Sequence, residues 1–239
     1  MIWQIDNATQ IAAHNFPLHI YASAPLNPTQ LPWPKLDLSN RSQWGSRILP
    51  GDTFPPQRPL QCSPDEIIKE FQAGHYLQAL ALTVCWGGMS RASQYIYRLL
   101  IGPLPAALQD RLHYSLQNIY NALDQCSQSI QQTQDIQQSW NLLTTELQWS
   151  SVITSKTLHF LCRALGFNQD PAVPIDNDVI LKYVWPGFRI GIPPAQRPHD
   201  WNGNDFAAYS RYMTAIIEWA KARNWTTTQV EATVYAENG

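Results

Sequence analysis

An apolar helix followed by a proline-punctuated return is the feature that most constrains the fold of this 239-residue chain. The expected helix spans residues 155–165 and carries Lys156 at its start. It climbs about 15 Å at 1.5 Å per residue, whereas residues 167–175 can span roughly 30 Å when extended. Two prolines in that stretch favour the extended path. The chain can therefore return to the start of the helix and place Lys156 beside Asp176.

Lys156 and Asp176 would together be equipped for covalent chemistry. An amine beside a carboxylate can attack an electrophilic carbon and form a Schiff base. Alone, a lysine in the first turn of a helix is usually solvated, and an aspartate at the start of a helix usually caps it. Because the two meet at this spacing, we interpret Lys156 as a nucleophile. Asp176 is then the carboxylate that stabilises a developing positive charge.

The residues around this pair resemble a known family. The pattern S-K-T-L-H-F-L-C-R-A-L-G-F over 155–167, followed by P-A-V-P-I-D over 171–176, is similar to the core of helix-hairpin-helix DNA glycosylases. The similarity is to the 8-oxoguanine DNA glycosylase/lyase (OGG) branch. It implies a mainly α helix-hairpin-helix DNA glycosylase fold, with a hairpin that ends in Lys156 as nucleophile and with Asp176 as the catalytic aspartate.

One departure from the family pattern concerns the hairpin. The family carries two glycines before the lysine, which bring backbone N–H groups close to a DNA phosphate. This chain has Val152-Ile153-Thr154-Ser155 instead. The departure indicates a divergent, OGG-like bacterial branch.

The resemblance also implies an activity. It points to a DNA N-glycosylase with AP lyase activity that acts in base excision repair on double-stranded DNA and flips out a modified base, such as 8-oxoguanine. We expect no cofactor and a monomer. Three alternatives stay open, namely a non-catalytic DNA-binding module on the same fold, a glycosylase against a hypermodified base in phage DNA, and a small-molecule Schiff-base enzyme such as an aldolase. The lack of alternating strand–helix units disfavours the barrel that is usual for the last class.

Further residues are candidate contacts with the substrate or with DNA. Trp86, Gly87 and Gly88 break the chain sharply, and they form either a stacking platform for the flipped base or a tight corner with a buried tryptophan. His159 follows Lys156 on roughly the same helix face, and it either contacts substrate or is a satisfied, buried histidine. The candidate phosphate contacts are Thr154, Ser155, Arg163 and Lys182.

Composition bears on partners and location. The net charge of −2 is low for a nucleic-acid binder. Residues 151–223 nevertheless hold eight Lys or Arg against six Asp or Glu, whereas 112–155 hold no Lys or Arg, so we expect any DNA face on the first of these segments. The four cysteines contain no C-x-x-C pair, so we expect no metal site. No apolar run and no leader pattern indicates a membrane, so we expect a cytoplasmic protein.

Two regions are expected along the chain. Residues 1–62 are rich in proline and are predicted to form an N-terminal wrap, in which 18–21 can form a short strand. Residues 63–239 are predicted to form a helical glycosylase-like body, with the hairpin and catalytic segment at 150–185. The predicted helices of this body cover 63–72, 76–85, 91–101, 105–131, 135–148, 155–165, 176–185, 205–223 and a short final helix opened by a capping box at 228–231.

Overall fold

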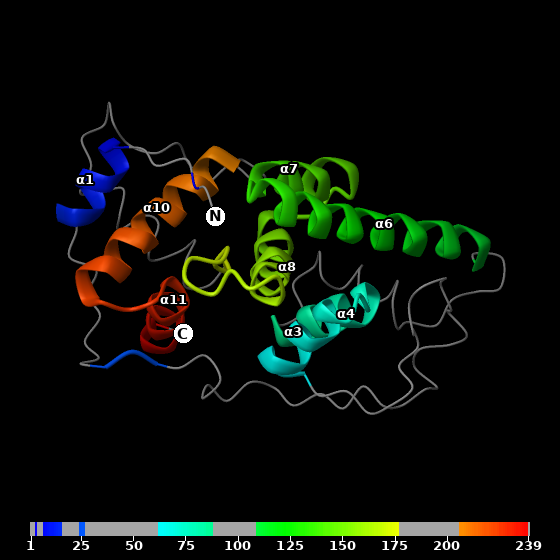
Figure 1. The fold of residues 1–239 in the computed structure, drawn as a ribbon, viewed down its shortest axis with the longest axis horizontal. Coiled ribbons are helices and arrows are strands. Elements are labelled where there is room, and N and C mark those ends of the chain that lie inside the picture. Colours follow the sequence, from blue (N-terminus) through cyan, green and yellow to red (C-terminus); the bar gives the residue numbers. More distant parts are fainter. Residues whose placement is uncertain are drawn as a thin grey trace.

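The computed structural model describes Trp3 and residues 7–15, 24–26, 62–87, 109–176 and 206–238. These residues are mainly helical, as predicted, and no strand occurs among them (Figure 1). The strand at 18–21 and the helices at 91–101 and 176–185 were predicted for segments that lie largely outside the described residues. The elements are α1 (Asn7–Asn15), α3 (Pro64–Gln72), α4 (Tyr76–Trp86), α6 (Gln109–Thr133), α7 (Ile136–Asn141), the π-helix η3 (Leu142–Glu146), α8 (Ser151–Ala164), α10 (Phe206–Arg223) and α11 (Thr227–Asn238).

The start and end of α3 follow the predicted local chemistry. The Ser63 hydroxyl accepts a hydrogen bond from the Glu66 backbone N–H at 3.3 Å, and Pro64 occupies the first helical position. Both features satisfy or remove donors that a helix start leaves unpaired. Gly74 ends the helical stretch in the left-handed region, with a φ of 76°. The chain then turns directly into α4.

The predicted helix at 135–148 differs in its second half. Asp135 caps α7 through a 2.8 Å hydrogen bond from the Gln137 backbone N–H, but the last turns widen into the π-helix η3. Gln148 then adopts a left-handed backbone with a φ of 53°. This residue ends the helical stretch and turns the chain toward α8.

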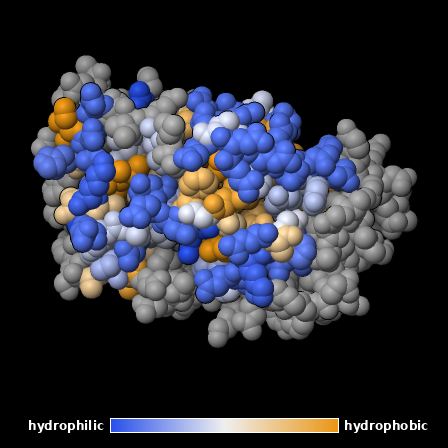
Figure 2. All heavy atoms as spheres, viewed as in Figure 1, coloured by the Kyte–Doolittle hydropathy of each residue, from blue (hydrophilic) through white to orange (hydrophobic). Residues whose placement is uncertain are grey.

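The helix α8 is the centre of the structure (Figure 1). Its residues from Ser151 to Cys162 are all buried, and it packs against α3, α4, α7 and η3. A helix that is buried on every side needs neighbours all round. Figure 2 shows apolar residues at the centre of this face, over α8 and the segment that follows it, with hydrophilic residues above and below.

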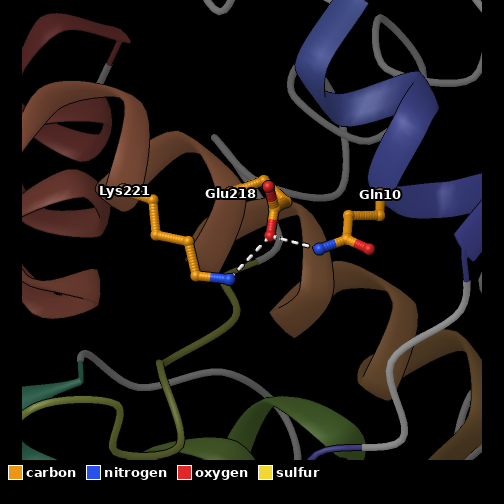
Figure 3. Close-up of polar contacts among 3 residues, drawn as sticks. All are labelled: Gln10, Glu218 and Lys221. Carbon is orange, nitrogen blue, oxygen red and sulfur yellow. Dashed lines mark hydrogen bonds and ion pairs between the residues drawn. The ribbon is translucent and has the colours of Figure 1, made fainter.

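The N-terminal segment contains a helix that the sequence analysis did not predict. α1 packs along α10, and Gln10 donates a 2.8 Å hydrogen bond to the Glu218 carboxylate, which also pairs with Lys221 at 2.9 Å (Figure 3). The Trp219 indole N–H donates to the carbonyl of Ala13 at 3.0 Å. Residues at the two ends of the chain therefore share one interface.

None of the helices that the structure describes is long and apolar enough to cross a membrane.

The Glu218 contacts predict a small pH-dependent stabilisation. Burial raises the pKa of Glu218. Hydrogen bonds from Lys221 and Gln10 lower this pKa by more than burial raises it, so the net shift is downward. A depressed pKa gives stability that is present above the ordinary value of 4.5 and is lost as the pH falls through the folded-state pKa. Glu218→Gln should therefore lower the free energy of unfolding by about 0.5–1 kcal/mol at neutral pH, and by nothing measurable at about pH 2.5.

Urea denaturation at the two pH values checks this expectation. Glu146→Gln, at an exposed position of η3, is the matched control because it removes a carboxylate without these partners. An equal loss at both pH values would show that the side chain acts through packing and not through its charge.

Candidate active site

The segment that follows α8 returns to the helix, as its reach and prolines predicted. The backbone N–H of Ile175 donates a 2.9 Å hydrogen bond to the Ser155 hydroxyl, which in turn donates to the carbonyl of Val152 at 3.0 Å. Residues 155 and 175 are thus in direct contact, one position before each member of the predicted pair. Lys156 and Asp176 therefore lie on neighbouring stretches of backbone.

Side chains of α8 and α10 hold the return segment through further hydrogen bonds. On the α8 side, His159 Nδ1 donates to the carbonyl of Ala172 at 2.8 Å. On the α10 side, the Tyr209 hydroxyl donates to the carbonyl of Val173 at 2.8 Å, and Met213 Sδ accepts from the Val173 N–H at 3.4 Å. The segment is completely buried at Ala172, Val173 and Ile175, so its polar backbone groups depend on these side chains.

Lys156 lies in the second turn of α8 and not at its start. Residues 151–155, where the hairpin was expected, already belong to the helix, so the connection from η3 is confined to residues 147–150. The side chain is only 8% exposed, and its Nζ donates a 2.8 Å hydrogen bond to the carbonyl of Gly87. That carbonyl lies at the C-terminal end of α4, where the helix dipole stabilises a positive charge.

Gly87 is required by the position of this lysine. A Cβ atom on Gly87 would lie 2.7 Å from Lys156 Cδ and 2.9 Å from Nζ. The ring of Trp86 lies beside the ammonium, with its centroid 5.9 Å from Nζ, and packs edge-on against Phe160 at 4.9 Å. Since Trp86 is buried, this structure favours the tight-corner interpretation. Gly88 lies outside the described residues.

A third ionisable group, Glu231, joins the pair from α11. Burial, and then the charge of Asp176, raise the pKa of Glu231 to about 8, while Lys156 acts in the opposite direction. Burial also raises the pKa values of Tyr209 and Tyr212 of α10, with Glu231 adding to both shifts. The electrostatics of the buried Glu231 carboxyl are therefore linked to those of Lys156 and Asp176.

Sequence reasoning placed Glu231 in a different role. We expected Thr228 and Glu231 to form the capping box of the last helix. The structure forms the box two residues earlier, where Thr226 and Gln229 exchange hydrogen bonds of 2.9 and 3.2 Å. The capping prediction is therefore wrong, and the side chain of Glu231 is buried instead.

The other predicted site residues differ in how far the structure buries them. His159 is buried, and burial, then the charge of Arg163, lower its pKa to about 3; it is the satisfied histidine of the simpler interpretation. Thr154 and Ser155 are completely buried, so neither side chain can reach a DNA phosphate in this structure. Arg163, in the last turn of α8, is partly exposed and stays a candidate. Lys182 lies outside the described residues.

The cysteines form no disulfide, and burial raises the pKa values of their thiols. No group of His, Cys, Asp or Glu among the described residues could hold a metal ion.

No family model, no curated protein and no solved structure matches this chain.

Removing the Ser155 hydroxyl should weaken the clamp. Ser155→Ala leaves the buried Ile175 N–H without an acceptor, which should lower the free energy of unfolding by about 1–3 kcal/mol. The control is Ser139→Ala, because Ser139 is equally buried but its hydroxyl contacts Cys126, through a 3.5 Å hydrogen bond to the carbonyl and an interaction with the thiol, instead of accepting from a backbone N–H. Chemical denaturation measures both variants. Equal losses would mean that the Ser155 contact with Ile175 has no special importance.

Gly87→Ala should force Lys156 out of its position. The backbone itself accepts alanine, since the φ of Gly87 is −79°, so the cost comes from overpacking and should be about 1–3 kcal/mol. In a Lys156→Ala background the clash is gone, and the same change should cost less than about 1 kcal/mol. A double-mutant cycle on unfolding free energies measures the coupling. An equal cost in both backgrounds would contradict the assigned contact.

Proposed function

We propose that this protein is a DNA glycosylase with AP lyase activity, of the helix-hairpin-helix kind, which excises a modified base. The observation that carries the proposal is the hydrogen bond between Ser155 and Ile175, because it holds the backbone next to Lys156 against the backbone next to Asp176, 20 residues along the chain. The burial of the amine supports the proposal, since a dry site strengthens the electrostatic interactions that a reaction uses.

The reaction would begin when the target nucleotide leaves the duplex and enters the site. Lys156 Nζ attacks the sugar C1′ with its free electron pair. The N-glycosidic bond breaks, and its electrons leave with the base. Loss of a proton from nitrogen and opening of the sugar ring give a Schiff base, from which β-elimination cleaves the strand. Asp176 stabilises the positive charge that develops on the sugar.

The contact of Lys156 with Gly87 would add a step to this sequence. In the described state, the Lys156 ammonium donates to the Gly87 carbonyl. Before it attacks, the group must leave that carbonyl and lose a proton. The Trp86 ring and the backbone of Gly87 therefore hold the amine in a resting position, from which the substrate has to draw it.

A second candidate function is a non-catalytic DNA-binding module. The observation that favours it is the same resting contact, because a buried lysine that bonds a helix C-terminus is also a structural element. In that case Lys156 would stabilise the corner after α4, and DNA contacts would come from surface residues such as Arg163. The two functions differ in whether a covalent adduct forms.

Borohydride trapping distinguishes them. We expect the wild-type protein to form a covalent adduct with duplexes from a panel that carries 8-oxoguanine, hypermodified cytosines and other altered bases. Lys156→Gln should abolish the adduct, because it removes the amine, and should leave duplex binding largely intact. Asp176→Asn should slow base excision at least about 100-fold, as loss of transition-state electrostatics generally does.

The matched control is Lys221→Gln, which removes one positive charge from an exposed position of α10. This variant should trap like the wild type. A Lys156→Gln protein that excises the base at the wild-type rate would refute the Schiff-base mechanism. Binding without any adduct over the whole panel would favour the non-catalytic module.

A further inference from the structure

Two cysteines lie where the start of α3 contacts the last turns of α4. Cys62 comes two positions before α3 and is only 1% exposed, and its Sγ donates a 3.3 Å hydrogen bond to the carbonyl of Leu82 in α4. Cys85 follows Leu82 by three residues in the same helix and is half-buried. α3 and α4 pack directly against each other. The Cys62 thiol therefore rests on the helical turn that carries Cys85.

Helix geometry brings the two sulfur atoms within reach of each other. The γ atom of a residue three positions after a helical carbonyl can turn onto that carbonyl, as serine and threonine hydroxyls do. The Sγ of Cys85 can thus approach the carbonyl of Leu82, which already accepts from the Sγ of Cys62. Cys85 also acts electrostatically on the Cys62 thiol, as a near neighbour does. A rotation of the Cys85 side chain then leads toward the separation of about 2 Å between sulfur atoms that a disulfide requires.

We propose that Cys62 and Cys85 form a reversible disulfide with a small-molecule disulfide such as oxidised glutathione as the oxidant, and that this bridge fastens the start of α3 to the last turn of α4. The inference goes beyond the proposed function and does not depend on it. In the structure both thiols are free, so the described state is the reduced form.

The exchange takes two steps. The Cys85 thiolate, which is the more exposed of the two, attacks one sulfur of the oxidant and forms a mixed disulfide. One glutathione thiolate leaves and takes up a proton. The Cys62 thiolate then attacks the Sγ of Cys85, the bond to glutathione breaks, and a second glutathione thiolate leaves and is protonated. Two protein thiols are oxidised, and one oxidised glutathione is reduced to two thiols.

Burial makes this exchange slow at neutral pH. It raises the pKa of Cys85 to about 11, and burial followed by the charge of Cys85 raises the pKa of Cys62 to about 12. The thiolate is the species that attacks a disulfide, so the rate rises as the pH approaches these values. The experiments are therefore run at about pH 9, where the thiolate fraction is roughly 100-fold larger than at about pH 7.

The bridge would lie next to the corner that holds Lys156. Cys85 directly precedes Trp86 and Gly87, and the Gly87 carbonyl accepts the hydrogen bond from Lys156 Nζ. A cross-link between residues 62 and 85 restricts the unfolded chain more than the folded one. Oxidation should therefore stabilise the packing of α3 on α4, from which this corner leads.

Peptide mapping of the oxidised protein tests the site directly. The folded full-length chain is incubated with oxidised glutathione, the remaining thiols are alkylated in denaturant, and the protein is digested without reductant. We expect one linked pair of peptides that contains Cys62 and Cys85, with Cys126 and Cys162 alkylated because both are completely buried. Dithiothreitol should release the pair. Four unlinked cysteines after oxidation, or a bridge between any other two, would overturn the proposal.

A matched pair of variants tests the second step. Cys62→Ala should stop after the first step and accumulate glutathione on Cys85, whereas the wild type should go on to the bridge. Cys126→Ala removes an equally buried thiol and should form the bridge like the wild type. A wild type that retains glutathione on Cys85 would show that Cys62 does not reach it, and would overturn the proposal. Where Cys62→Ala does not fold, the peptide map of the wild type decides the question alone.

Urea denaturation measures the effect on the two helices. The oxidised wild type should unfold at a higher urea concentration than the reduced wild type. Cys85→Ser cannot form the bridge, so its midpoint should be the same after treatment with oxidised or reduced glutathione. Equal midpoints for the oxidised and reduced wild type would overturn the claim that the bridge fastens α3 to α4.

Discussion

The hydrogen bond from the Ile175 N–H to the Ser155 hydroxyl is the contact on which the candidate site depends. It joins the return segment to α8 and gives the buried Ile175 N–H an acceptor. His159, Tyr209 and Met213 extend the same clamp along the segment.

The sequence predicted this meeting of two stretches because chain reach and proline stiffness are local properties. It also predicted most of the helices that can be compared, since apolar periodicity and caps such as Ser63 depend on only a few neighbouring residues. The start of α8 was missed. A hairpin was expected from family resemblance, yet nothing in Val152-Ile153-Thr154-Ser155 breaks a helix. The structure accordingly continues the helix back to Ser151.

The surroundings of Lys156 and Glu231 could not be predicted, because they depend on helices distant in the chain. From the sequence alone, a lysine near the start of a helix is expected to be solvated. In the structure, the end of α4 covers Lys156. The two capping patterns, Thr226 with Gln229 and Thr228 with Glu231, satisfy the same local rule, and the structure forms the first in a helix that packs against α10. Burial of the unused glutamate is a consequence of that selection.

The resting contact of Lys156 also bears on chemical selectivity. A reactive primary amine in a cell meets sugars, aldehydes and acyl donors that modify exposed lysines. In this protein the amine is inside the fold, bonded to a carbonyl, beside an indole ring and 69 residues from its partner in the sequence. Glycation and adventitious acylation should therefore reach Lys221 long before Lys156. The corner after α4 therefore shields the Lys156 amine from such reagents.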